Sequence, residues 1–348
     1  MRDVCNSGTL FVVGVATAIA VLIPQIVNLY LVIVYSNLAI MALFALSLAW
    51  VWGYGGILCF GQSAFFGLAA YVYAVSVINI GESTAPFLLA VLVPTVFAAV
   101  IGALMFYGRV SDIYFAIITL CVTLILYSLI SSTAGPQFHI FAARLNGQNG
   151  ISGFRPLNLP GRSDDVLGPV ESFYVCMTFL IGCYVALKFL LSSRFGRVVV
   201  AVRENPVRAE LLGYDTRWTR TFVFTIGAAI AGLAGALFAV WGTYVNPSLF
   251  DLRMAALVII WVVVGGLGTL AGPMVGAVAL QYLGNVLGKQ QLANTGMIYG
   301  FLLIVFVMLV PQGVFPTMQR LISRWSLRRS QYEMKLLGDD ISKGMQGR

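Results

Sequence analysis

Charged side chains are scarce in this sequence. Asp, Glu, Lys and Arg make up 10% of the 348 residues, whereas a soluble domain carries about 25%. Hydrophobic residues make up 59%. Because a soluble globule of this size needs far more charge on its surface, the composition excludes that class. The sequence predicts an all-α polytopic membrane protein.

Residues that carry chemistry are scarce as well. The chain has one histidine, His139, and five cysteines without the spacing of a metal site or a disulfide framework. It has no G-x-x-x-x-G-K-[ST] phosphate loop and no clustered basic face of a nucleic-acid-binding type. We therefore expect no catalysis, no metal, no cofactor and no nucleic acid partner for this chain.

Ionisable residues are absent from the middle of the apolar runs. Proton-driven and voltage-driven proteins keep such groups at membrane depth, so the sequence argues against a self-powered transporter. A self-sufficient channel or carrier remains a rival hypothesis, and a membrane anchor of a redox complex would need cofactor ligands that are not available. Neutral polar residues and glycines are candidates for a substrate path, although hydrogen bonding and close packing between helices explain them too. The candidates are Gly61, Gln62, Ser63, Thr119, Thr123, Gly265, Gly266 and Gly268.

Apolar runs of about 20 residues, the length that crosses a bilayer, predict eight spans. A further run, 253–288, is too long for one crossing and is interrupted by glycines, which predicts either two short crossings or a crossing plus a re-entrant piece. Lys and Arg are retained in cytoplasmic loops, and their distribution favours about ten spans with both termini cytoplasmic. The eight runs are 9–27, 31–50, 57–80, 86–107, 111–131, 170–191, 221–241 and 297–314.

Segment 192–220 is polar and contains six arginines, which places it in the cytoplasm. It predicts a short helix from about Pro206 to Leu212, with Asn205 as the N-cap and Gly213 at the left-handed C′ position. A helix this short needs a partner to be stable. Its apolar face packs either on a separate subunit or on the chain's own membrane domain. The face consists of Val207, Leu211 and Leu212.

Two other polar segments complete the domain organisation. Residues 132–169, rich in glycine, proline and aromatics, predict an ordered extracytoplasmic loop that either docks a protein or covers the bundle. The basic tail 316–348 is expected in the cytoplasm, where anionic lipids attract it. We therefore expect a membrane domain over 1–315 followed by this tail.

Four stretches carry a resemblance to a known family: 53–71, 108–120, 195–215 and 262–277. Their sequences are GYGGILCFGQSAFFGLAAY, GRVSDIYFAIITL, FGRVVVAVRENPVRAELLGYD and VVVGGLGTLAGPMVGA. Together they resemble the LivM-like permeases of ABC importers for branched-chain amino acids, a family that also includes permeases for urea and short amides. The chain departs at Cys59-Phe60-Gly61-Gln62, where family members commonly have Ser-Leu-Gly-His, so an imidazole role there is not carried over.

The resemblance implies a type II importer architecture in a bacterial cytoplasmic membrane. The implied partners are a LivH-like second permease, two cytoplasmic ATPase subunits that bind the ATP, and an extracytoplasmic solute-binding protein. The segment 203–213 would be the helix that couples to the ATPases, and the loop around Gly147, Asn149 and Gly150 would meet the binding protein. The expected coupling residues are Arg203, Glu204, Asn205, Pro206, Arg208, Glu210, Leu211 and Gly213. The implied solute is a branched-chain amino acid or, alternatively, urea or a short amide.

Overall fold

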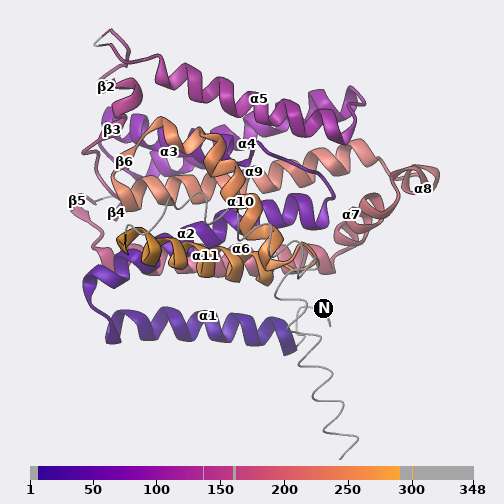
Figure 1. Ribbon diagram of the computed structural model, residues 1–348, viewed down its shortest axis with the longest axis horizontal. Helices are drawn as coiled ribbons and strands as arrows, with labels where there is room; N and C mark the ends of the chain where they lie inside the picture. Colours follow the sequence, from indigo (N-terminus) through magenta and orange to yellow (C-terminus); the bar gives the residue numbers. More distant parts are fainter. Residues whose placement is uncertain (1–6, 136, 160–161, 291–299, 301–348) are drawn as a thin grey trace, which may run out of the picture.

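The computed structural model describes residues 7–135, 137–159, 162–290 and 300. Long helices dominate this part of the chain and run alongside one another (Figure 1). Seven of them are long and apolar enough to cross a bilayer. They are α1 (Ser7–Ile26), α2 (Leu29–Leu48), α3 (Gln62–Ile80), α4 (Thr84–Tyr107), α5 (Asp112–Ser131), α6 (Pro169–Ser192) and α9 (Thr216–Gly242).

The long run 253–288 folds as two helices. These are α10 (Leu252–Gly265) and α11 (Ala271–Gln290), which pack against each other. With 14 residues, α10 is about 21 Å long, which is shorter than the hydrocarbon core of about 30 Å. The expected span 297–314 lies outside the described residues, so the count of ten spans stays a prediction.

The two ends of the bundle differ in structure (Figure 1). One end, called here the basic end, carries α7 (Arg194–Glu204) and α8 (Pro206–Leu211). The other, called here the strand end, carries short antiparallel strand pairs and two 3₁₀ turns. Its elements are β1 (His139–Ile140), β2 (Ala143–Arg144), η2 (Gly147–Asn149), β3 (Ile151–Ser152), β4 (Asn158–Leu159), β5 (Arg162–Val166), β6 (Tyr244–Val245) and η3 (Pro247–Phe250).

The core lies where α2, α3, α4 and α9 meet. Of the 18 residues in the apolar segment of each helix, 72% are buried in α9 and 6% in α1. Helix α9 is therefore central and α1 is peripheral. Small residues let neighbouring helices approach α9 closely. Gly235 faces the backbone of Phe66 on α3, and Gly232 faces Pro94 on α4. In the part of the core nearer to the basic end, the Phe224 ring packs edge-on against the Phe115 ring, with the centroids 5.1 Å apart.

The connection from α2 to α3 differs from the expected spans 31–50 and 57–80. After α2 the chain continues as a π-helix, η1 (Ala49–Tyr54), and the backbone N–H of Gly55 donates to the carbonyl of Trp50. Residues 49–56 are called here the π-turn. The chain then passes through 57–61 without helix, so that α3 begins at Gln62 rather than at 57. Because Gln62 contacts Gly227 near the middle of α9, α3 starts inside the bundle.

Candidate functional site

Helix α8 has the two caps that the sequence predicts. The Asn205 side-chain oxygen accepts from the backbone N–H of Arg208 at 2.9 Å. At the other end Gly213 has φ +87°, its N–H donates to Glu210, and the N–H of Tyr214 donates to Ala209. This pair of bonds is a Schellman motif, which only a residue tolerant of positive φ completes without strain. Local sequence therefore fixes the length of α8.

The apolar face of α8 is uncovered within the described part of the chain. Val207, Leu211 and Leu212 are 64%, 82% and 75% exposed. Only Ala209 of this helix is buried, and the Glu210 carboxylate bonds to Thr216 at the start of α9. The sequence left two interpretations of this apolar face open. Within the described residues, the three aliphatic side chains do not pack on the membrane domain of the same chain.

A groove of about 480 Å³ lies beside α8 at the basic end. It runs between the end of α4 and the start of α9, and Thr216 in its wall donates to the Glu210 carboxylate at 2.5 Å. Arg220 pairs with Asp112 at 2.9 Å, which joins α9 to the start of α5. The groove thus has fixed walls and a mixed apolar and charged lining. Its lining residues are Phe106, Arg109, Val110, Pro206, Val207, Glu210, Thr216, Arg217 and Arg220.

Arg203 connects this end of the chain to the π-turn. Its Nη1 donates to the Gly53 carbonyl at 2.6 Å, and its guanidinium also pairs with the exposed Glu204. A Cβ atom on Gly56, which has φ +69°, would lie 2.6 Å from Cγ of Arg203. The arginine therefore packs along the π-turn backbone as well as bonding to it.

The π-turn also contacts two further elements. Trp50 Nε1 donates to the Val223 carbonyl on α9 at 3.0 Å. A Cβ atom on Gly53 would collide with the Leu267 carbonyl in the connection between α10 and α11, and the Tyr54 hydroxyl donates to the neighbouring Gly268 carbonyl at 3.4 Å. One turn thus meets α7, α9 and the α10–α11 connection.

The candidate path residues fall into two groups in space. The first surrounds the start of α3, where a Cβ atom on Gly61 would lie 2.8 Å from Thr119. Gln62 donates to Ser47 Oγ at 3.1 Å and to the Gly227 carbonyl at 3.2 Å. Thr119 and Thr123 donate to backbone carbonyls of their own helix.

The hydroxyl of Ser63 differs from its neighbours. Gln62 and Ser63 are both fully buried, but the Ser63 hydroxyl has no hydrogen-bond partner within the described residues. A buried unpaired hydroxyl costs free energy. Most of the first group therefore hydrogen-bonds within the protein, and Ser63 is the member left to contact something else.

The second group lies at the α10–α11 connection. A Cβ atom on Gly265 would collide with the backbone of Gly272, and Gly266 has φ +109°. A Cβ atom on Gly268 would meet no described atom within 4 Å, and the Gly268 carbonyl accepts from Tyr54. These glycines permit a tight turn between α10 and α11.

The glycines of the outer loop are packed. Gly147 and Gly150 are buried, and a Cβ atom on Gly150 would collide with the Val245 carbonyl beside β6. Asn149 is exposed, and its carbonyl accepts from the Tyr244 hydroxyl at 3.2 Å. Any contribution of the two glycines to docking is through the shape of the loop, and that docking role stays a prediction.

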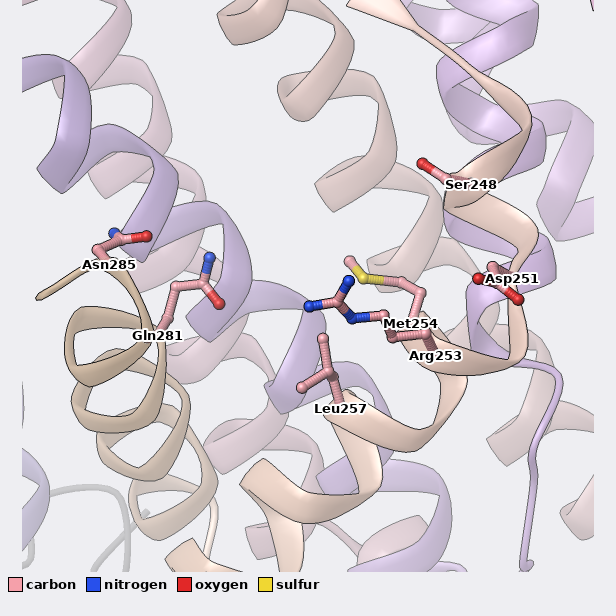
Figure 2. Close-up of a pocket in the computed structure, with 8 residues that line it drawn as sticks. Ser248, Asp251, Arg253, Met254, Leu257, Gln281 and Asn285 are labelled. Atoms are coloured by element: carbon pink, nitrogen blue, oxygen red, sulfur yellow. The ribbon is translucent and has the colours of Figure 1, made fainter. Parts of the chain in front are cut away.

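A second groove, of about 410 Å³, lies at the strand-end halves of α10 and α11 (Figure 2). Asp251 and Arg253 are not among the site residues expected from the sequence, because they lie at the end of an apolar run, where charged residues are common. The sequence did contain one signal for a polar site. Asp251 and Arg253 lie two residues apart, beside an apolar run that also contains Gln281 and Asn285. What brings these four residues together is the folding back of α11 along α10.

The fold and these sites define a class of protein: a multi-pass helical membrane protein with an exposed, doubly capped helix at one end of the bundle. The family model described as branched-chain amino acid transport system / permease component matches residues 30–308. The chain belongs to this family.

Individual relatives agree with that assignment. The chain is 27% identical over 281 residues to the high-affinity branched-chain amino acid transport system permease protein LivM of Escherichia coli K12, covering 76% of this chain and 65% of that protein. It is 28% identical over 315 residues to LivM of Salmonella typhimurium, covering 86% and 73%. A probable LivH permease of Methanocaldococcus jannaschii is 28% identical over 151 residues, covering 41% and 46%. No solved structure matches this chain.

Proposed function

We propose that this chain is a transmembrane permease subunit of an ATP-driven importer for branched-chain amino acids or related small polar solutes. The observation that carries the proposal is the uncovered face of α8, with three large aliphatic side chains exposed on a helix that its own caps hold in shape. Exposed apolar residues grouped beside a groove are typical of a protein interface. The occupant we propose is an ATPase subunit, which binds the ATP and hydrolyses it while this chain has no catalytic role.

The relatives support the rest of the assembly. Because both LivM and LivH permeases match the chain, we propose a LivH-like second permease, two ATPases and an extracytoplasmic binding protein. The arginines of 192–220 favour a cytoplasmic basic end in a bacterial cytoplasmic membrane, with both termini and the tail 316–348 on the same side. The strand end would then face the binding protein.

The contacts of Arg203 suggest how motion passes from α8 into the bundle. Asn205 and Ser193 cap α8 and α7 at their starts, so the two helices have defined ends. Displacement of α8 by an ATPase would move Arg203, and Arg203 holds the Gly53 carbonyl. Since Gly53 lies against Leu267, the α10–α11 connection would move with it. Alternating access would follow from this sequence of contacts.

The experiment compares two pairs of exposed aliphatic residues. In the reconstituted importer, the double variant Val207→Ala with Leu211→Ala removes the apolar face of α8. We expect copurification of the ATPases and uptake of leucine to fall by about tenfold or more, because loss of central apolar interface residues typically costs about 2 kcal/mol or more. Pull-down on the permease and uptake into liposomes measure the two effects.

The matched control is Leu88→Ala with Leu92→Ala on α4, whose side chains are 67% and 56% exposed. Equal ATPase binding by the α8 variant and this control would contradict the assignment of α8. Solute flux through the chain with no ATPase present would contradict the proposal as a whole and favour a channel. Uptake of urea or a short amide in place of leucine would correct the solute.

A further inference from the structure

The groove at the strand end combines charged and apolar walls. Arg253 and Asp251 lie at the start of α10, and the Arg253 side chain points across the groove toward Gln281 and Asn285 on α11 (Figure 2). Met254, which follows Arg253 in the chain, and Leu257, one turn further along α10, supply apolar surface. The volume of about 410 Å³ lies within the range of roughly 300–1,000 Å³ found for small-molecule sites.

Neither charged side chain has a partner within the described residues. Asp251 occupies the N-cap position of α10, yet its carboxylate caps no backbone N–H. No described ion pair joins Asp251 to Arg253. By contrast, Arg203 and Arg220, at the basic end, are both engaged with carboxylates. A cation and an anion held apart on one wall, with two neutral amides opposite, present complementary positions for a ligand that carries both charges.

We propose that this groove binds the α-amino acid zwitterion during transport, with Arg253 contacting the carboxylate, Asp251 the ammonium group, and Met254 and Leu257 the aliphatic side chain. The inference rests on the proposed function and deepens it by naming the site and its recognition chemistry. It assigns recognition of the zwitterion to this groove and not to the buried residues around Gln62.

The chemistry fits each part of such a ligand. A guanidinium presents two parallel N–H donors, which match the two oxygens of a carboxylate. An ammonium group donates hydrogen bonds that the Asp251 carboxylate can accept. The amides of Gln281 and Asn285 lie on the other side of Arg253 (Figure 2), where they can donate to the carboxylate of the ligand. Met254 adapts its shape to different aliphatic groups because its side chain is unbranched and flexible. Urea and short amides have no ionised groups to match Arg253 and Asp251, whereas the zwitterion has one of each sign.

The test uses protection of a thiol in the assembled importer without its binding protein. Ser248, which lines the groove and is exposed, is replaced by cysteine, and the exposed native Cys121 by alanine. Leucine is expected to slow the reaction of the Ser248→Cys thiol with a thiol reagent. Leucinamide lacks the carboxylate and 2-hydroxy-4-methylpentanoate lacks the ammonium group, so both should protect far less.

Adding Arg253→Gln should raise the leucine concentration needed for protection by about tenfold or more, since a hydrogen bond to a charged group is lost. Asp251→Asn should weaken protection in the same direction. The matched control is Arg144→Gln, an exposed arginine at the same end of the bundle, which should change nothing. A cysteine at Val286, on α11 but outside the groove, should react at the same rate with and without leucine.

The outcomes distinguish an error in the groove assignment from an error in the proposed function. If the complete importer takes up leucine but leucine never protects Ser248→Cys, or protects equally with Arg253→Gln, the groove assignment is wrong and the proposed function stands. If the complete importer takes up no amino acid at all, the proposed function itself fails. Protection by leucine that Arg253→Gln weakens and Arg144→Gln does not supports the assignment.

Discussion

Two non-helical breaks between consecutive helices of this bundle are stabilised by different kinds of contact. The break at 55–61, before α3, is held by side chains: Gln62 bonds to α2 and α9, and Trp50 bonds to α9. The break at 266–270, between α10 and α11, depends on close backbone contact, because Gly265 and Gly272 touch without side chains between them. One local side-chain bond adds to it: Thr269 Oγ1 accepts from the Gly272 N–H at 3.1 Å. The first is called here the amide-held break and the second the glycine-held break.

The two breaks differ in how much substitution they tolerate. Backbone contact requires the absence of a Cβ atom, so the glycine-held break is sensitive to the smallest addition. A side-chain hydrogen bond within a helical membrane protein contributes only about 0.6 kcal/mol on average, so the amide-held break loses little with each bond. The glycine-held break meets the π-turn, which directly precedes the amide-held break, at Gly53 and Leu267. Substitutions there should therefore have effects of very different size.

Gly53→Ala should have the largest effect. Its Cβ atom would overlap the Leu267 carbonyl, and a backbone group cannot rotate away as a side chain can. We expect a loss of about 3 kcal/mol in the free energy of unfolding, even though alanine is favoured over glycine inside a helix by about 1 kcal/mol. Thermal unfolding of the purified protein, followed by fluorescence-detected size exclusion, measures the change.

The control for this prediction is Gly268→Ala. Gly268 lies in the same contact region, but a Cβ atom there would meet nothing within 4 Å. Its unfolding temperature should match that of the wild type. Equal losses from Gly53→Ala and Gly268→Ala would mean that general flexibility, rather than backbone contact, holds the glycine-held break.

Much of this architecture follows from local sequence. Apolar runs predicted the seven long helices closely, because a bilayer requires about 20 consecutive apolar residues whatever surrounds them. Asn205 and Gly213 predicted both ends of α8, since a cap acts on its own turn of helix. Expectations that depend only on neighbours in the chain succeeded.

Features that depend on distant contacts were not predictable. The π-turn follows α2, and the non-helical residues 57–61 shorten the expected span 57–80. The partners of the π-turn, Val223 and Arg203, are 173 and 150 residues from Trp50 and Gly53. The groove at Arg253 forms only because α11 folds back along α10. The role of the two glycine-rich stretches in a substrate path stays a prediction. A sequence pattern shows that a glycine permits close approach, but not what approaches it.

Gln62→Ala should have an intermediate effect and tests the amide-held break. The substitution removes two hydrogen bonds that join the start of α3 to α2 and α9. We expect a loss of about 1 kcal/mol in the free energy of unfolding, measured in the same assay. The control is Gln281→Ala, because the Gln281 amide has no hydrogen bond among the described residues. A loss as large as that of Gly53→Ala would remove the distinction between the two breaks.

Ser63→Ala should have the smallest effect on stability and is the most informative about transport. The Ser63 hydroxyl is fully buried and has no partner within the described residues, so removing it should leave the free energy of unfolding unchanged or raise it by up to about 1 kcal/mol. Ser47→Ala is the control, because the equally buried Ser47 donates to Phe44 and accepts from Gln62, and its loss should destabilise. A Ser63→Ala protein of normal stability with reduced leucine uptake would mean that this hydroxyl bonds to the passing solute. Normal uptake would mean that the amide-held break has only a structural role and that the solute is recognised elsewhere in the bundle.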